Sequence, residues 1–75
     1  MKELLEIIAR SLVDSPDEVI VKQEQSGDTV ILRLSVAQSD MGKVIGKSGR
    51  IAKAIRAVMN AAASKDRVKV IVDIQ

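Results

Sequence analysis

Two hydrophobic periodicities follow one another along this chain of 75 residues, and their order limits the folds that it can adopt. Apolar residues recur every three to four positions in some segments, which is typical of amphipathic helices, and every second position in others, which predicts strands. The expected elements are helices at 2–13, 39–45 and 50–64 and strands at 18–25, 29–36 and 67–74. Because each strand has one apolar and one mixed face, this α-β-β-α-α-β order predicts a two-layer α+β domain, with the strand order left open.

The same spacing predicts which helical side chains are buried. The first helix is expected to bury Leu4, Leu5, Ile8, Ala9 and Leu12, and the last to bury Ile51, Ala54, Ile55, Val58, Met59 and Ala62. Ser26-Gly27-Asp28 predicts a hairpin turn between the first two strands. Ser39 is expected to be the N-cap of the short helix, with Asp40 in its first turn.

Composition narrows the class of protein. Residues 1–75 make one domain with room for one small core. The sequence has neither cysteine nor histidine, so it offers no disulfide, no thiolate metal site and not the commonest general base. No apolar stretch approaches the roughly 20 residues that span a bilayer, and the N-terminal pattern is not that of a signal peptide. We therefore expect a cytoplasmic protein with no membrane association, metal or cofactor.

The net charge of +2 conceals an uneven distribution. Residues 1–37 carry four basic and seven acidic side chains, whereas residues 38–75 carry eight basic and three acidic ones. The second half is therefore cationic, as an electrostatic footprint for nucleic acid would require. Taken alone, this asymmetry favours a solvated basic face over a nucleic-acid site.

A glycine-bounded cationic turn, Gly46-Lys47-Ser48-Gly49, lies in this basic half, immediately before the longest expected helix. Glycine lacks Cβ, so another backbone can approach the turn closely and unusual φ values are allowed. The helix directs its free N–H groups and the positive end of its dipole at the turn, which favours an anion. Lys47 and Arg50 add two full charges. A ligand that carries phosphates would satisfy all of these features.

A nucleotide-binding P-loop is the first alternative, and its spacing is wrong. Only three residues separate Gly42 from Gly46, whereas the P-loop motif needs four. No side chain is placed as a nucleophile beside a base, so we expect no catalytic residue, no small-molecule substrate and no enzyme. For the glycines alone, a tight connection between two helices is a simpler interpretation.

A metal site is the second alternative, because Asp14, Asp17 and Glu18 are close in sequence. They surround Pro16 at the expected end of the first helix. Capping and solvation of a proline-containing turn account for them better than a metal ion does.

The run Val44-Ile45-Gly46-Lys47-Ser48-Gly49, followed by an amphipathic helix, resembles the GxxG signature of KH domains. In these domains the loop clamps about four backbone nucleotides of a single strand. The element order, the length and the run from Asp40 to Arg56 resemble the small bacterial KhpA family of single-KH RNA-binding proteins. This resemblance covers nearly the whole chain. It implies a type II, bacterial-type KH fold, with three helices on one face of a three-stranded sheet.

We therefore predict a protein that binds single-stranded RNA. Backbone groups of Gly46–Gly49 would contact the sugar–phosphate chain, and Lys47 and Arg50 would neutralise phosphates. The candidate RNA-binding residues are Lys43, Val44, Ile45, Gly46, Lys47, Ser48, Gly49, Arg50, Ile51 and Lys53. Val44 and Ile45, with Ile51 or a residue of a strand, would form an apolar floor. Lys43, Lys53 and Arg56 either extend the basic surface or serve only solubility. The chain has no aromatic residue, so base stacking on aromatic rings is absent and binding should be weak and dominated by the backbone.

A partner is also expected, since four nucleotides read by one domain give little specificity. The resemblance implies the same, because KhpA proteins pair with a second KH-containing protein, KhpB, and act as broad RNA-binding regulators. We expect a broad post-transcriptional RNA regulator or chaperone that pairs with a KhpB-type protein or forms a homodimer. The alternative is a protein-interaction or dimerisation module in which the GxxG loop is a weak or vestigial nucleic-acid site.

Overall fold

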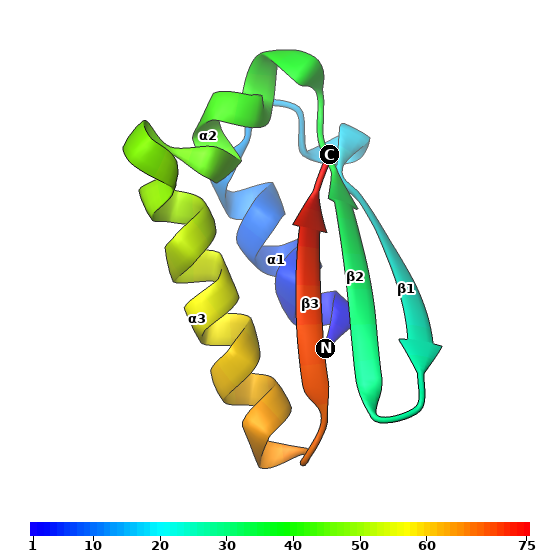
Figure 1. Cartoon of the computed structure of the whole chain (residues 1–75). Helices are drawn as coiled ribbons and strands as arrows, with labels where there is room; N and C mark the ends of the chain where they lie inside the picture. The colour runs from blue at the N-terminus through cyan, green and yellow to red at the C-terminus, as the bar shows by residue number, and fades with distance from the viewer.

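The computed structural model describes residues 1–75 and has the order of elements expected from the sequence (Figure 1). The helices are α1 (Lys2–Leu12), α2 (Met41–Ile45) and α3 (Arg50–Lys65), and the strands are β1 (Ile20–Ser26), β2 (Thr29–Ser35) and β3 (Lys69–Ile74). Short 3-10 turns lie at Pro16–Glu18, Gln38–Asp40 and Lys47–Gly49. The first of these turns includes Glu18, which was expected to begin β1, and the N–H of Val19 donates to the carbonyl of Pro16. The predicted α+β fold with three helices and a three-stranded sheet is confirmed.

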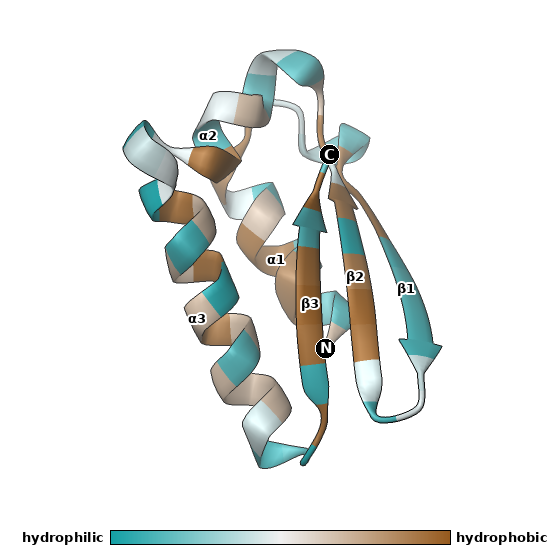
Figure 2. Ribbon diagram, viewed as in Figure 1, coloured by the Kyte–Doolittle hydropathy of each residue, from teal (hydrophilic) through white to brown (hydrophobic).

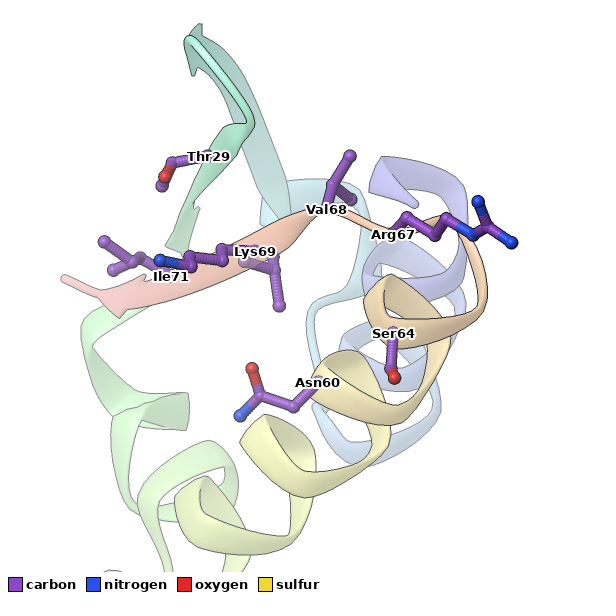
Figure 3. A pocket seen from close by; sticks show the side chains of 8 residues that line it. Thr29, Asn60, Ser64, Arg67, Val68, Lys69 and Ile71 are labelled. Atoms are coloured by element: carbon purple, nitrogen blue, oxygen red, sulfur yellow. The ribbon is translucent and has the colours of Figure 1, made fainter.

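The strands are arranged in the order β1-β2-β3, which the sequence had left open. β1 and β2 form the predicted antiparallel hairpin, and Ser26 pairs with Thr29 across a two-residue turn. β3 returns through α2 and α3 to lie parallel to β2. This connection leaves β3 at an open edge of the sheet beside α3, where a pocket lies between strand and helix (Figure 3).

The hydrophobic core lies between the sheet and the layer formed by α1 and α3 (Figure 2). α1 contacts β1 and α3, while α3 contacts β3, so the two helices cover one face of the sheet together. The fully or nearly fully buried core residues are Leu5, Ala9, Val19, Val21, Val30, Leu32, Leu34, Ile55, Met59 and Val72. The alternating pattern of β2 holds, because Val30, Leu32 and Leu34 are buried and their neighbours are not.

The buried face of α3 differs from the expected one. Ile55 and Met59 are buried as predicted, but the other buried positions are Ala52 and Ala63. Val58 is 48% exposed, and of the remaining expected core positions Ala54 is exposed while Ile51 and Ala62 are half-buried. The apolar arc of α3 is wider than the strip that the sheet and α1 cover. Leu12 of α1 is likewise 36% exposed.

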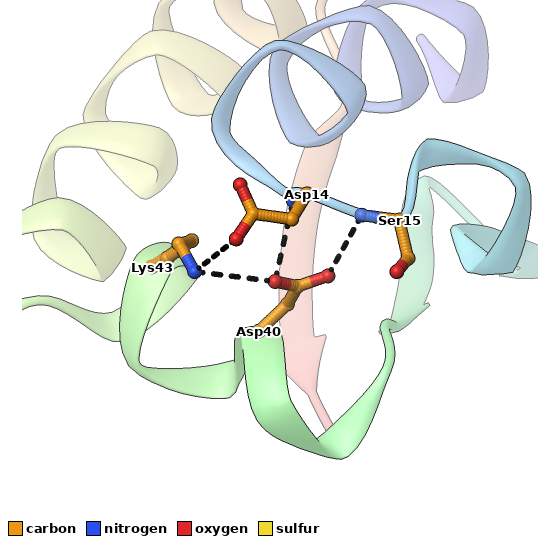
Figure 4. Close-up of polar contacts among 4 residues, drawn as sticks. All are labelled: Asp14, Ser15, Asp40 and Lys43. Atoms are coloured by element: carbon orange, nitrogen blue, oxygen red, sulfur yellow. Dashed lines mark hydrogen bonds and ion pairs between the residues drawn. The ribbon is translucent and has the colours of Figure 1, made fainter.

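The prediction that Ser39 caps α2 is wrong. Ser39 lies inside the 3-10 turn that precedes α2, and its side chain makes no capping hydrogen bond. Asp40 is buried instead, and its carboxylate accepts the backbone N–H groups of Asp14 and Ser15 at 3.2 and 3.1 Å (Figure 4). The ammonium of Lys43 lies 3.5 Å from Asp40 and 2.8 Å from Asp14. Through these contacts Asp40 links the segment after α1 to the start of α2, although the two segments are 25 residues apart in the sequence.

Acidification should weaken the hydrogen bonds and the ion pair of the Asp40 carboxylate. Burial raises the pKa of Asp40, but the N–H groups of Asp14 and Ser15 and the ammonium of Lys43 more than offset this effect and hold the pKa below its usual value. A lowered folded pKa stabilises the protein fully above the unfolded pKa of about 3.9, and this stability is lost as the pH falls through the folded pKa. We expect the melting temperature to fall on acidification below about pH 4, and Asp40→Asn to lower it already at neutral pH and to flatten the acid dependence.

The matched control is Asp17→Asn, which removes an exposed carboxylate in the neighbouring 3-10 turn. Its melting temperature and pH profile should stay close to those of the wild type in thermal unfolding followed by circular dichroism. An Asp40→Asn variant with the same melting temperature as the wild type at every pH would refute the stabilising role of this carboxylate.

Candidate nucleic-acid interface

The loop between α2 and α3 is built from residues with positive φ. Gly46 ends α2 with φ 77° and ψ 174°, a conformation that is essentially restricted to glycine. Ser48 and Gly49 follow with φ values of 57° and 73°, in the left-handed region. The N–H of Gly49 donates to the carbonyl of Gly46 at 3.2 Å and closes the loop. α3 begins directly at Arg50, so the positive end of its dipole faces the loop.

The two glycines of the loop serve different purposes. A Cβ on Gly46 would lie 2.6 Å from Cγ1 of Ile51, which is closer than carbon atoms can approach. A Cβ on Gly49 would meet nothing within 4 Å. The expectation that a glycine leaves room for a ligand therefore holds for Gly49 but not for Gly46. Gly46 lets Ile51 pack beneath the loop, and only Gly49 has open space beside its Cα.

The charged side chains of the loop and of the start of α3 are exposed and free of ion pairs. Lys47, Arg50 and Lys53 are all exposed, as is Ser48 at the tip of the loop. The basic residues that do form ion pairs are Arg10, Arg33 and Lys43. Thus every lysine and arginine from Lys47 to Lys69, seven in number, lacks a carboxylate partner. The surface along α3 and at both of its ends therefore carries positive charge without ion-pair partners, which attracts anions.

Val44 and Ile51, two of the predicted site residues, lie beneath the loop rather than on its surface. The side chain of Val44 is fully buried, so it supports α2 from the core side. Lys43 is engaged by carboxylates, and the hydrogen bond from its ammonium to Asp14 raises its pKa above the usual value. Ile51 is half-buried and packs against the core. Ile45, at the end of α2, keeps 36% of its surface exposed.

Arg56 has a specific partner that the sequence did not reveal. Its Nε donates to the backbone carbonyl of Val72 at 3.3 Å, so the side chain crosses from α3 to the free edge of β3. From the sequence, Arg56 was expected, together with Lys43 and Lys53, only to extend the basic surface or to serve solubility. The strand that Arg56 meets depends on the sheet order, which no local pattern encodes.

An apolar groove lies on the opposite side of α3, against α1. It has a volume of about 350 Å³ and one charged residue, Arg50, at its rim. Its apolar lining consists of Ile8, Leu12, Ile51, Ala54, Ile55 and Val58. We call it the α1–α3 groove. These side chains were predicted to belong to the core. The only sequence signal for the groove was that the apolar arc of α3 is wider than the surface one packing neighbour would cover.

No group of three or more potential metal ligands is brought together. None of the helices has the length and apolar character needed to cross a membrane.

A glycine loop joining two helices, in a three-helix layer on a β1-β2-β3 sheet with parallel β2 and β3, defines a KH domain of type II. Residues 2–74 match the family model described as KhpA/KhpB, KH domain, and the chain belongs to this family. The family predicted from the sequence is therefore confirmed.

Several curated relatives are similar over their whole length. The chain is 60% identical to the RNA-binding protein KhpA of Clostridium perfringens and 61% identical to that of Clostridium acetobutylicum, over 74 residues and 99% of each protein. It is 50% identical to the RNA-binding protein KhpA of Chlamydia trachomatis, across 99% of this chain and 95% of the relative.

The division between the two glycines can be tested by measuring stability. Gly46→Ala should lower the free energy of unfolding by about 2 kcal/mol or more, because the new methyl group meets Ile51 in a backbone conformation reserved for glycine. Gly49→Ala should lower it by only about 1 kcal/mol, the cost of a left-handed alanine with free space around it. Urea unfolding measures both values. Equal losses in the two variants would show that the contact with Ile51 is unimportant.

Proposed function

We propose that this protein binds single-stranded RNA through the Gly46–Gly49 loop and the first turns of α3. The observation that carries the proposal is an exposed, cationic GxxG loop without a compensating carboxylate, at the N-terminus of a 16-residue helix. The names of the curated relatives, which are RNA-binding proteins, support it. In this role the protein would act in the cytoplasm as a broad post-transcriptional regulator or RNA chaperone, without a catalytic step.

The proposed contacts follow from where each side chain lies. The open side of Gly49 admits the sugar–phosphate backbone, while Lys47, Arg50 and Lys53 neutralise phosphates. The exposed part of Ile45 provides an apolar contact beside the loop. Val44 and Ile51 support α2 and the loop from beneath, and Lys43 holds α2 through its ion pairs with Asp14 and Asp40, so these three residues contribute indirectly.

The absence of aromatic residues sets the character of the binding. Stacking of bases on aromatic rings contributes about 1–3 kcal/mol per base in other single-strand binders, and this chain has no such ring. Phosphate contacts therefore supply most of the affinity. Binding should be weak, broad in sequence and strongly dependent on salt.

Reversing the charge of the loop tests this proposal. The double variant Lys47→Asp/Ser48→Asp should weaken binding to a single-stranded RNA at least about tenfold and leave thermal stability nearly unchanged, because both side chains are exposed. For the wild type, log K should fall with log salt by roughly 0.7 for each phosphate contact. Fluorescence anisotropy with a labelled oligonucleotide measures both quantities.

The control for this variant is Lys22→Glu/Gln23→Glu on β1, which changes the net charge by the same amount at exposed positions. It should bind RNA almost as well as the wild type. If both double variants lose affinity equally, net charge and not the loop explains binding, and the proposed site is wrong.

A second role, association with another KH-containing chain, is favoured by the α1–α3 groove. Its exposed lining is almost entirely apolar, and such surfaces commonly mark sites of protein contact. The partner would be a second copy of this chain or the KhpB-type protein that the family description suggests. Two linked loops would raise the effective affinity for one RNA without any new kind of contact.

A charge placed in the groove should prevent this association. Val58→Glu puts a carboxylate into the apolar lining, and sedimentation equilibrium should then show only monomer under conditions where the wild type self-associates. Ile7→Glu is the matched control, because Ile7 is also an exposed apolar residue, at 63%, but lies outside the groove. A Val58→Glu variant that associates as strongly as the wild type would rule out the groove as the interface.

A further inference from the structure

The sheet has a second open edge, formed by β1 on the side away from α3 (Figure 1). β1 is seven residues long, and its pairing with β2 runs from Ile20 to Ser26 without a bulge. Sheet edges in native proteins are commonly short, bulged, interrupted by proline or covered by another element, because an open edge can pair with a strand of another chain. Apart from its charged side chains, Lys22 and Glu24, β1 has none of these protective features.

The second half of β1 is exposed on both faces of the sheet. Val21 is the one buried residue of the strand, and every residue from Lys22 to Ser26 is exposed. The helices therefore leave this half of the strand uncovered. They would not obstruct another strand laid beside it.

The direction of the backbone groups of β1 follows from the pairing of β2. The carbonyl of Leu34 accepts a hydrogen bond from the chain that follows β3, so the backbone groups of Leu34 face β3. Directions alternate along a strand, so Arg33 faces β1, and Lys22, which is paired with it, faces β2. The residues of β1 that direct their N–H and C=O groups away from β2 are Val21, Gln23 and Gln25. We call them the three edge residues.

Charge selects one way of pairing two copies of β1. In antiparallel pairing about a twofold axis at Gln23, the edge residues of one copy lie opposite those of the other, and each outward N–H meets an outward carbonyl. Lys22 then lies opposite Glu24 of the second copy, twice by symmetry. An axis at Lys22 or at Glu24 would place two like charges opposite each other. An axis at Val21 or at Gln25 would lie near an end of the strand and pair fewer residues.

The pairing about Gln23 gives Lys22 a partner that it lacks within its own chain. Glu24 is paired with Arg33 on the same face of the hairpin, whereas Lys22 forms no ion pair. Lys22 and Glu24 of the second copy would form a non-hydrogen-bonded pair, in which opposite side chains lie closest. The second copy therefore supplies a carboxylate beside an unpaired ammonium.

The charge distribution also favours β1 over the other edge of the sheet. At β3, two copies would bring together Arg67 and Lys69 of each chain, and Arg56 already occupies the carbonyl of Val72. At β1, the cationic surface along α3 lies on the far side of each copy, because α3 packs beside β3. Association through β1 therefore keeps the two positive surfaces apart.

We propose that two copies of this chain associate through the free edges of β1, antiparallel about Gln23, so that their two sheets form one continuous sheet. This interface is separate from the α1–α3 groove and uses no residue of the Gly46–Gly49 loop. Because it is small and polar, it is weaker than association through the groove and forms only at roughly millimolar protein. It does not depend on the proposed RNA-binding function.

The first test is a concentration series, followed by NMR, on protein that carries Val58→Glu, which removes association through the groove. The amide shifts of the three edge residues should change with concentration. Those of Lys22 and Glu24 should change less, because their N–H groups bond to β2 within the hairpin. Edge amides whose shifts stay constant up to roughly millimolar protein would overturn the proposal.

The second test exchanges the opposed charges, in the same Val58→Glu protein. Lys22→Glu places two carboxylates opposite each other, and Glu24→Lys places two ammonium groups, so each variant alone should associate about tenfold more weakly. An equimolar mixture of the two variants restores both attractive pairs. It should associate about as strongly as the parent in sedimentation equilibrium.

The control variant is Lys65→Glu, which changes the net charge as Lys22→Glu does but lies at the end of α3, away from β1. It should associate as the parent does. An equal loss in this control would attribute the effect to net charge and overturn the proposal. A mixture that associates no more strongly than the separate variants would overturn it too.

Discussion

The close contact between Gly46 and Ile51 determines where the loop sits on the rest of the protein. Ile51 packs against the core from the first turn of α3, and the missing Cβ of Gly46 allows α2 to end directly above it. The base of the loop is therefore fixed to the core, while Lys47 and Ser48 project into solvent. A loop held in this way is organised before any ligand arrives, which reduces the conformational entropy lost on binding.

The charges divide into two groups with different uses. Lys43 and Arg33 pair with carboxylates and hold parts of the fold together, most clearly where Asp14, Asp40 and Lys43 join the α1 side of the molecule to α2. The seven basic residues from Lys47 to Lys69 have no such partners. Their mutual repulsion opposes folding to a small extent. A polyanionic ligand along α3 would relieve that repulsion, which connects the proposed function with the charge pattern in the sequence.

Much of this fold could be predicted from local patterns. The periodicities of α1, β2 and α3 gave the order of elements and most of their limits, since each reflects one buried face. The GxxG loop was also visible in the sequence. What escaped prediction depends on contacts between distant segments. Ser39 was predicted to cap α2 from its local sequence. Asp40 is instead fixed by hydrogen bonds from a segment about 25 residues earlier, which a local pattern does not reveal. The role of Arg56 depends on β3 being the edge strand, and the true buried face of α3 depends on which part of a wide apolar arc α1 covers.

The most direct test of the account is to record which backbone amides respond when RNA binds. A ¹⁵N-labelled sample is titrated with a single-stranded RNA, and amide chemical shifts are followed by NMR. We predict the largest changes at Lys47, Ser48, Gly49 and Arg50, with little change at the β1–β2 turn around Gly27. Saturable shifts that leave the loop amides unaffected and concentrate elsewhere would contradict the central claim that this loop holds the RNA backbone.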